Sequence, residues 1–497
     1  MNYISTRDKT VCLTSSQAIA KGISSEGGLF VPETIPSISL ETVESFIKLD
    51  YISRAKEILK LFLTDFSDEE LSYCVENAYK QGKFSSEKVA PTVWLHDNIN
   101  LLELWRGPTC AFKDMALQLL PYLLTVSAKK VCPDKEIVIL VATSGDTGKA
   151  ALEGFKDVEN TRILVFYPVD GVSPMQKLQM TTQQGENVSV CAIKGNFDDA
   201  QNGVKSIFTN KEIEKKFKEN SLSFSSANSI NWGRLVPQIV YYISSYCDMV
   251  GQGSISLGDK INIAVPTGNF GNILAAYYAK EMGLPVKKLI CASNANNVLT
   301  DFINTGIYDK NREFYMTCSP SMDILISSNL ERLLFLLSDK DDAEISSLMK
   351  KLSTEGKYQV SPSVLKKLQN TFAAGCCDDE MTKKTIKKVY EKYSYLCDTH
   401  TAVAICVADE YVEKTGDKTP IVIASTANPY KFSKSVLLSV KSDVKALDEF
   451  DMVNELNAFT SVPIPEALSS LKGKTPRFTQ VTDKEHMPEV VMNMLGI

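Results

Sequence analysis

A lysine after a Gly-Pro turn is the first candidate for covalent chemistry in this chain. Lys113 lies in the sequence Gly-Pro-Thr-Cys-Ala-Phe-Lys-Asp-Met-Ala-Leu of residues 107–117, beside an apolar residue and at the expected start of a helix. Burial there lowers the pKa of a lysine and leaves a nucleophilic amine, the form that makes a Schiff base with an aldehyde. The ordinary alternative is a solvated lysine at a helix start. A Schiff-base role for Lys113 therefore depends on what other segments of the chain supply.

A turn rich in small residues follows the apolar run 137–142. Residues 142–148 read Ala-Thr-Ser-Gly-Asp-Thr-Gly and precede an expected helix. Hydroxyl residues and glycines at a helix N-terminus expose backbone N–H groups, which favour an anion such as a carboxylate. A strand–helix turn capped by Ser or Thr gives the same pattern without a ligand.

Two further turns follow strands. Residues 266–272, Pro-Thr-Gly-Asn-Phe-Gly-Asn, can wrap a phosphate at a helix N-terminus, but they match neither a dinucleotide fingerprint nor a P-loop. Residues 424–429, Ala-Ser-Thr-Ala-Asn-Pro, end the last strong strand and place a hydroxyl where it could bond a pyridine nitrogen. Open α/β sheets bind ligands at the carboxyl ends of their strands, so these segments are expected to converge.

Short apolar runs alternate with helical segments from about residue 99 onward. The strongest runs are 137–142, 163–167, 188–193, 261–265, 288–292 and 421–424. Fully apolar runs are typical of parallel strands buried on both faces. The pattern predicts an α/β protein with two mostly parallel sheets flanked by helices.

The chain is expected to contain four regions. They are a mainly helical region 1–95, a smaller α/β domain 96–205 with Lys113, a larger α/β domain 206–445 with a helical insertion 308–395, and a C-terminal extension 446–497. The larger domain would carry the loop at 266–272, and the smaller one the turn at 142–148.

Composition excludes several classes of function. The chain has 497 residues, a formal charge of −6 and no long basic run, which argues against a nucleic-acid or anionic-membrane surface. Only three histidines are present, so a zinc site or a Ser-His-Asp hydrolase is not expected; His400 could line a site or cap a helix. The twelve cysteines form no C-x-x-C pair, no signal peptide is evident and no apolar stretch reaches about 20 residues, so a cytoplasmic protein is expected.

Taken together, these segments resemble threonine synthase, a pyridoxal-phosphate-dependent family of fold type II. The resemblance is carried by residues 27–32, 107–114, 143–148, 226–231 and 268–271. It implies that Lys113 forms the Schiff base with pyridoxal 5′-phosphate and that Thr426 faces the pyridine nitrogen. The residues implied to hold the cofactor phosphate are Gly268, Asn269, Phe270, Gly271 and Asn272.

The resemblance also implies a substrate pocket. Ser144 and Thr147 would bind the substrate carboxylate. Asp146 stands where many relatives place Asn near the cofactor O3′, and an ionised carboxylate would be repelled by a phenolate. Asp146 is therefore either protonated, shifted or different in role.

The substrate phosphate calls for cationic or hydrogen-bonding side chains. Arg234 is the first candidate, followed by Asn228, Ser229 and Lys177, each with a surface or helix-capping role as the alternative.

The reaction implied by the resemblance converts O-phospho-L-homoserine and water into L-threonine and phosphate, the last step of threonine biosynthesis. Lys113 would act as general base and proton relay. Three alternatives stay open: a phosphohomoserine phospho-lyase that releases 2-oxobutanoate, a serine or threonine dehydratase, and a non-catalytic regulatory protein that binds the cofactor. A monomer or a homodimer is expected, with no metal, nucleic acid or membrane partner.

Overall fold

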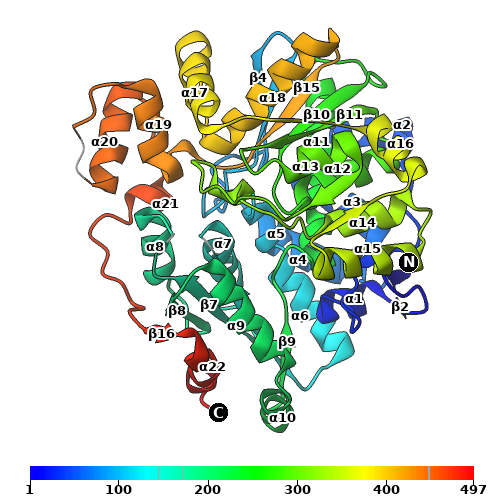
Figure 1. Ribbon diagram of the computed structural model, residues 1–497, viewed down its shortest axis with the longest axis vertical. Coiled ribbons are helices and arrows are strands. Elements are labelled where there is room, and N and C mark those ends of the chain that lie inside the picture. The colour runs from blue at the N-terminus through cyan, green and yellow to red at the C-terminus, as the bar shows by residue number, and fades with distance from the viewer. Residues whose placement is uncertain (144, 171, 446–447) are drawn as a thin grey trace.

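Two β-sheets organise the protein, one in the upper part of Figure 1 and one in the lower part. The computed structural model describes residues 1–143, 145–170, 172–445 and 448–497. Helices flank both sheets, as the alternation of apolar runs and helical segments predicted. The predicted α/β class with two mostly parallel sheets is confirmed.

The larger sheet has six strands in the order β14-β11-β10-β15-β5-β4. All neighbours are parallel except β4 and β5, which form an antiparallel pair. Its strands are β4 (Thr92–His96), β5 (Ile99–Glu103), β10 (Ile261–Pro266), β11 (Val286–Ser293), β14 (Phe372–Cys376) and β15 (Ile421–Ser425). Every residue of β10 and β15 is buried, because helices cover both faces. The main helices against this sheet are α11 (Trp232–Gly251), α12 (Gly271–Glu281) and α18 (Thr399–Thr415).

The smaller sheet has five parallel strands in the order β16-β8-β7-β6-β9. Its strands are β6 (Glu136–Ala142), β7 (Thr161–Pro168), β8 (Val188–Lys194), β9 (Leu222–Ser225) and β16 (Val481–Asp483). The helices around it are α7 (Asp146–Phe155), α8 (Pro174–Thr181), α9 (Phe197–Thr209), α10 (Lys211–Glu219) and α22 (Met487–Leu495).

The N-terminal region is mainly helical, as expected, and adds a three-stranded antiparallel sheet. Its elements are β1 (Tyr3–Ser5), β2 (Cys12–Leu13), α1 (Ser15–Lys21), β3 (Phe30–Pro32), α2 (Leu40–Ile47), α3 (Tyr51–Phe62) and α4 (Asp68–Tyr79). Helices α5 (Asp114–Leu117) and α6 (Leu120–Val131) then lead into the smaller sheet. Side-chain caps begin most of the N-terminal helices, for example Ser67 on α4, whose hydroxyl accepts from the N–H of Glu70.

The predicted helical insertion carries four α-helices, a 3-10 helix and a small two-stranded antiparallel sheet, and one further helix precedes it. The elements from residue 298 to 393 are α13 (Val298–Thr305), β12 (Ile307–Asp309), η1 (Pro320–Met322), α14 (Leu330–Leu337), α15 (Asp342–Thr354), β13 (Lys357–Gln359), α16 (Pro362–Thr371) and α17 (Asp379–Tyr393). The chain ends through η2 (Pro429–Phe432), α19 (Ser433–Val440), α20 (Glu449–Thr460), α21 (Glu466–Ser469) and η3 (Lys484–His486).

Strand pairing departs from the expected region boundaries. β5, expected in the smaller domain 96–205, pairs with β15 of the larger sheet. β9, beyond residue 205, pairs with β6 of the smaller sheet, and β16 of the C-terminal extension also joins that sheet. β14, inside the insertion 308–395, is an edge strand of the larger sheet. An apolar run predicts a strand, but partners distant in sequence decide which sheet receives it.

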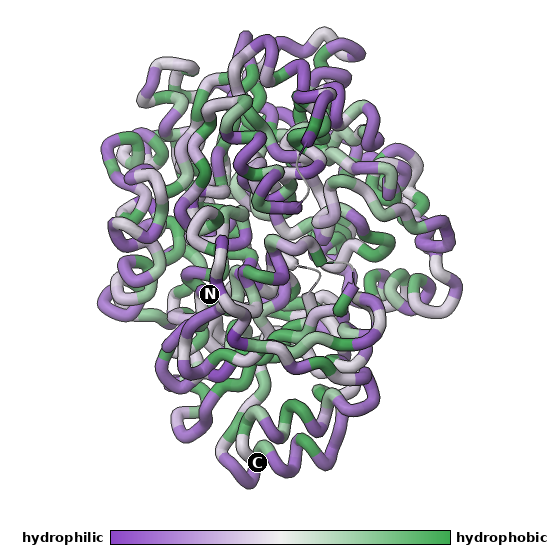
Figure 2. The backbone as a smooth tube through the Cα atoms, turned by 90° about the vertical axis from the view of Figure 1, so that its left-hand side faces the viewer, coloured by the Kyte–Doolittle hydropathy of each residue, from purple (hydrophilic) through white to green (hydrophobic). Residues whose placement is uncertain are grey.

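The apolar side chains of both sheets form the interior, and Figure 2 shows polar residues along much of the outer backbone. Among the described residues, no helix combines the length and the apolar character needed to cross a bilayer.

Candidate functional site

Lys113 lies where the segment after β5 enters α5, and its side chain is almost fully buried, with 11% exposed. Its Nζ donates a hydrogen bond to Ser321 Oγ at 3.2 Å and lies 3.6 Å from Asp146 Oδ2. Burial lowers the pKa of Lys113, and the charges of Lys431 and Arg234 lower it further, against the opposing effect of Asp146. The sequence predicted a lowered pKa for this lysine, and its burial acts in that direction.

Asp146 is the first residue of α7 and is held by two lysines and an amide. Lys431 Nζ lies 2.7 Å from its Oδ1, and Gln176 Nε2 donates to the same oxygen at 2.8 Å. Burial by itself raises the pKa of this carboxyl, but the nearby Lys431 and Lys113 outweigh burial and hold the pKa well below its usual range. Asp146 is therefore ionised, which removes the protonated form from the alternatives left open by the sequence.

Lys431 is a site residue that the sequence did not single out. It lies in η2, just beyond β15, and its side chain has no exposed surface. Besides the ion pair with Asp146, its Nζ donates to the carbonyl oxygen of Thr109 at 2.8 Å. Lys431 thus joins the Gly-Pro-Thr turn to the start of α7. The only available signal was a lysine two residues after Asn-Pro at the end of a buried strand.

The turn before Lys113 is folded against Asp114. The carboxylate of Asp114 accepts from the backbone N–H of Thr109 at 2.8 Å and from its hydroxyl at 2.7 Å. A Cβ atom on Gly107 would lie 2.5 Å from the Asp114 side chain, so only glycine fits there. Burial raises the pKa of Asp114 to about 6, despite the lowering effect of the Thr109 hydrogen bonds.

The loop 268–272 turns two of its carbonyl groups toward the segment 327–329. Gly268 O accepts from Ser327 Oγ at 2.7 Å, and Asn269 O accepts from the backbone N–H and the side-chain amide of Asn329 at 3.1 and 3.0 Å. In a trans peptide the N–H points opposite to the carbonyl, so the N–H groups of Asn269 and Phe270 face away from the segment 327–329. The loop therefore offers backbone donors to an anion.

Helix α12 begins in the same loop without a side-chain cap, and Phe270 before it adopts a left-handed conformation with φ 63°. A Cβ on Gly268 would lie 2.6 Å from the carbonyl oxygen of Ser321, which restricts this position to glycine. Asn272 is buried; its Oδ1 accepts from Tyr241 and Tyr242, whereas its Nδ2 has no hydrogen-bond partner among the described residues. An uncapped helix start with an unpartnered amide donor is suited to a phosphate.

Thr426 lies beside the lysine segment. It is buried at the carboxyl end of β15, and its carbonyl oxygen accepts from the N–H of Phe112 at 2.8 Å. The isolated bridge between Ala111 and Ala427 fixes the same contact. The structure thus brings the predicted pyridine-facing residue next to Lys113.

His400 supports the lysine through Ser321. The backbone N–H of Ser321 donates to His400 Nε2 at 3.1 Å, and its hydroxyl accepts from Lys113 Nζ. His400 is buried in the first turn of α18, where Asp398 caps the helix. In this contact Nε2 is the acceptor, and the other ring nitrogen lies 3.4 Å from Thr399 Oγ1.

The predicted substrate residues are brought together only in part. Arg234 is buried on α11; one terminal nitrogen donates to Ala227 O at 2.6 Å, and its Nε has no partner among the described residues. Thr147 is half-buried in the first turn of α7. Asn228 is exposed and Ser229 half-buried in the turn before α11.

Two predicted substrate residues lie elsewhere. Lys177 is exposed on α8, so the structure does not bring it to Asp146; its neighbour Gln176 makes that contact instead. Ser144 lies outside the described residues.

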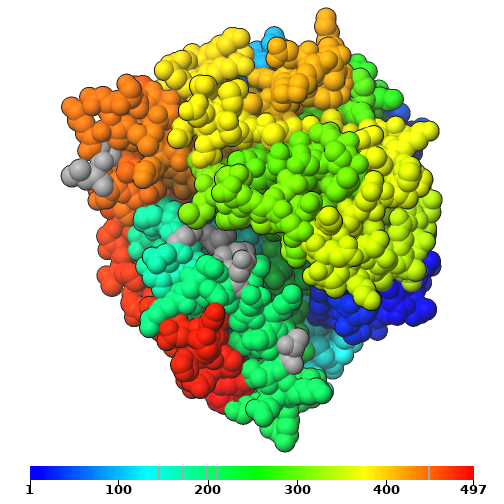
Figure 3. Space-filling view, viewed as in Figure 1, coloured from blue at the N-terminus to red at the C-terminus, as the bar shows by residue number. Residues whose placement is uncertain are grey.

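The site therefore lies between the two sheets, at the carboxyl ends of their strands. β6 leads to Asp146, β10 leads to the loop 268–272, and β15 leads to Thr426 and Lys431. On the face shown in Figure 3, the molecule is hollowed between the part with the larger sheet and the part with the smaller sheet. A poorly solvated amine, an anion-binding loop and a buried arginine together suit a carbonyl cofactor that carries a phosphate, with an anionic substrate.

Family models match three consecutive parts of the chain. The model for the threonine synthase N terminus matches residues 2–79, the model for pyridoxal-phosphate-dependent enzymes matches residues 95–426, and the threonine synthase C-terminal model matches residues 401–491.

Curated relatives agree with these matches. Threonine synthase of Saccharomyces cerevisiae is 37% identical over 463 residues, which are 87% of this chain and 88% of the yeast protein. Human threonine synthase-like 1 is 42% identical over 87% of this chain but only 58% of its own length. The chain thus spans less than two thirds of the threonine synthase-like 1 relatives that it matches.

Solved structures share the whole fold. The pyridoxal-phosphate-bound threonine synthase of Brucella melitensis superposes with a TM-score of 0.88 at 35% identity, covering 99% of each chain. The yeast threonine synthase structure gives a TM-score of 0.89 at 33% identity and covers 100% of this chain and 99% of its own. The resemblance inferred from the sequence is confirmed: this chain belongs to the threonine synthase family of pyridoxal-phosphate-dependent enzymes of fold type II.

Proposed function

We propose that this protein converts O-phospho-L-homoserine and water into L-threonine and inorganic phosphate. The observation that carries the proposal is the buried group of Lys113, Asp146 and Lys431 beside an anion-binding loop, in a chain whose family is established. Threonine synthases match it over about nine tenths of both lengths, which favours the synthase over the phospho-lyase alternative.

The residues present fit pyridoxal phosphate. The unpartnered Asn272 Nδ2, the outward N–H groups of the loop 268–272 and the uncapped α12 would hold its phosphate. Lys113 would bind its aldehyde carbon, and Thr426 would face its pyridine nitrogen. When bound, the cofactor supplies an electron sink for negative charge that develops on the substrate.

The chain's own side chains would handle protons and anions. Lys113, with a depressed pKa, is the base that takes the proton from the substrate Cα. Its bond to Ser321 directs the amine while it is free. Thr147 and the first N–H groups of α7 would receive the substrate carboxylate, while the N–H of Gly148 is already bonded to Thr143 Oγ1. Arg234 would receive the substrate phosphate through the unpartnered Nε.

Asp146 acquires a role through Lys431. Opposite a cofactor phenolate, an ionised carboxylate alone would be repulsive, but Lys431 supplies the compensating positive charge at 2.7 Å. The pair would act there as a neutral polar group, as an asparagine would.

Compartment and assembly belong to the same proposal. All twelve cysteines are free thiols in the structure, which supports a reducing compartment such as the cytoplasm. A monomer or homodimer remains the prediction for the assembly.

The test incubates the protein, loaded with pyridoxal phosphate, with O-phospho-L-homoserine and follows phosphate, threonine and 2-oxobutanoate together. Phosphate matched by threonine supports the proposal, and Lys113→Ala should abolish both products. Phosphate matched by 2-oxobutanoate would assign the phospho-lyase reaction instead. A protein that binds the cofactor at Lys113 but releases no phosphate would refute the proposed substrate.

A further inference from the structure

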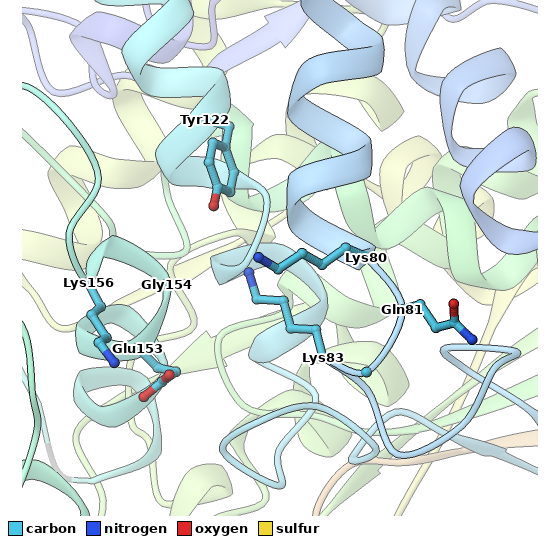
Figure 4. Close-up of a pocket in the computed structure, with 8 residues that line it drawn as sticks. Lys80, Gln81, Lys83, Tyr122, Glu153, Gly154 and Lys156 are labelled. Carbon is cyan, nitrogen blue, oxygen red and sulfur yellow. The ribbon is translucent and has the colours of Figure 1, made fainter.

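A second hollow lies on the far side of the helices that begin at the catalytic lysine and at Asp146. It has a volume of about 430 Å³. Its wall is formed by Lys80, Gln81, Gly82 and Lys83 after α4, Tyr122 on α6, and Glu153, Gly154 and Lys156 at the end of α7. Figure 4 shows the amines of Lys80 and Lys83 below the Tyr122 hydroxyl, with Glu153 and Lys156 across from them.

The hollow carries unbalanced positive charge. Among the ion pairs of the described residues, none involves Lys80, Lys83 or Lys156, and Glu153 is the one carboxylate in the wall that acts on them. Glu153 is already engaged, since its carboxylate accepts from Lys149 at 2.9 Å and from Gln183 Nε2 at 3.1 Å. Three ammonium groups therefore line the hollow beside a single carboxylate, Glu153, which is shared with Lys149.

The partial negative charges of two helix C-termini offset only part of this positive charge. Lys80 and Lys156 directly follow α4 and α7, and each helix end contributes about half a negative charge. Lys83 Nζ donates to Asn77 O on the last turn of α4, but at 3.3 Å this is a long bond. A surplus of about two positive charges remains, which matches a phosphate dianion.

The side chains select among anions. The wall contains three lysines, a phenol hydroxyl, an amide and the carboxylate of Glu153, but no arginine. A guanidinium is the group that matches a planar carboxylate in a two-bond fork. Lysines act as point charges and suit a tetrahedral phosphate. The volume also lies within the range of small-molecule sites.

We propose that this hollow is a second anion site that binds inorganic phosphate or a small phosphate monoester. The pKa of Lys83 is lowered to about 8 by burial and by the neighbouring charge of Lys80, so a bound anion would relieve an existing penalty. The proposal is independent of the proposed reaction, because none of the wall residues belongs to the site around Lys113.

The site would connect two parts of the protein. Lys80 and Lys83 come from the N-terminal region, whereas Lys156 follows α7 of the smaller sheet. A Cβ on Gly154 would lie 1.9 Å from Leu117 O, which shows that α7 packs directly on α5. An anion held by both parts would therefore join the loop 80–83 to helices that begin at Asp146 and next to Lys113, and it would stabilise the folded protein.

The test is a calorimetric titration of the cofactor-loaded protein with inorganic phosphate, and separately with glycerol phosphate, at pH 7 and low salt. We expect the double variant Lys83→Gln/Lys156→Gln to raise the Kd of one phosphate-binding event at least tenfold, or to abolish that event. The matched control, Lys129→Gln/Lys418→Gln, removes two exposed lysines elsewhere and should leave it unchanged. The ligand that binds more tightly shows whether the site prefers inorganic phosphate or a phosphate monoester. A titration with sulfate measures how much of the affinity comes from charge attraction alone. Phosphate that binds both double variants with equal affinity would overturn the proposal.

A measurement on the unaltered protein covers the case in which the double variant fails to fold. Lysine acylation, quantified by mass spectrometry at pH 8, should fall severalfold at Lys83 when phosphate is present and should not change at Lys129. Equal acylation of Lys83 with and without phosphate would refute the site. Both readouts are binding measurements, so they keep their meaning if O-phospho-L-homoserine is not turned over.

Discussion

Lys431 and Asp146 form an ion pair inside the protein, with 2.7 Å between Nζ and Oδ1 and with 0% and 3% of their side chains exposed. Lys431 follows the larger sheet, and Asp146 follows the first strand of the smaller sheet. The pair therefore fixes the carboxyl edges of the two sheets against each other. Because Lys113 lies 3.6 Å from the same carboxylate, the pair also sets the charge around the reactive amine.

Removing one member of this pair should destabilise the protein strongly. Asp146→Asn leaves Lys431 as a buried charge without its partner, and we expect a loss of about 3–5 kcal/mol in the free energy of unfolding. Lys431→Met should also destabilise, but the double variant should lose clearly less than the sum of the two. Urea unfolding of the four proteins measures this coupling.

The exposed pair Lys60–Asp68, 2.6 Å apart with 57% and 68% exposed side chains, provides the control cycle. Its coupling should stay below about 1 kcal/mol, because water screens the interaction. A coupling at Asp146–Lys431 as small as that of the control would contradict the assigned role of the buried pair.

Asp114 should make stability fall as the pH rises from about 4 to 6. Burial raises its folded-state pKa to about 6 from an ordinary value of 3.8, so the folded protein keeps the proton after the unfolded chain has lost it. A pKa difference of about two units corresponds to a loss of about 3 kcal/mol in the free energy of unfolding. This loss is complete above the folded-state pKa. Asp114→Asn cannot ionise and should lack this decline, which urea unfolding at pH 4.5 and 7 would detect. Parallel pH profiles of the two proteins would rule the effect out.

Gly268→Ala should disrupt the anion-binding loop. The added Cβ would meet the Ser321 carbonyl at 2.6 Å, so the loop or η1 must move. We expect affinity for pyridoxal phosphate to fall at least tenfold, measured by fluorescence titration of the cofactor-free protein. Gly251→Ala on α11, whose nearest atom is a side-chain methyl group at 3.3 Å, should bind the cofactor normally. Equal affinities in the two variants would exclude a steric role for Gly268.

Arg234 and Lys177 should differ as substrate contacts. Arg234 is buried with an unpartnered Nε, whereas Lys177 is exposed on α8. Arg234→Met should raise KM for O-phospho-L-homoserine at least tenfold more than Lys177→Met, with cofactor absorbance retained in both. Steady-state kinetics measure both KM values. A larger rise in KM for Lys177→Met than for Arg234→Met would favour Lys177 as the ligand of the substrate phosphate.

Much of the fold was predictable from local patterns. The six apolar runs became strands of the two sheets, because residues buried on both faces must be apolar along the whole strand. Assignment of strands to sheets was not predictable in the same way. β5 and β16 are short, and their partners β15 and β8 lie far from them in the sequence.

The candidate lysine and the candidate phosphate loop could be chosen from the sequence, because each choice depends on a short run of residues at a strand end. Lys113 and Gly268 were identified from their immediate neighbours, and the structure brings their segments together through Ser321. Lys431 contacts groups from other segments, and no local sequence pattern predicts such contacts. His400 was considered as a residue that lines a site, but its contact with Ser321 depends on the tertiary structure.

The sequence by itself determined the fold class and the family, and it supplied the candidate lysine and the candidate anion-binding turns, since each depends on local chemistry and periodicity. Only the tertiary structure decided the charge state of Asp146. A carboxylate stays ionised in the interior when positive charges lie within a few ångströms. Those charges, on Lys431 and Lys113, come close to Asp146 only when the carboxyl ends of the strands of the two sheets face each other in the folded protein.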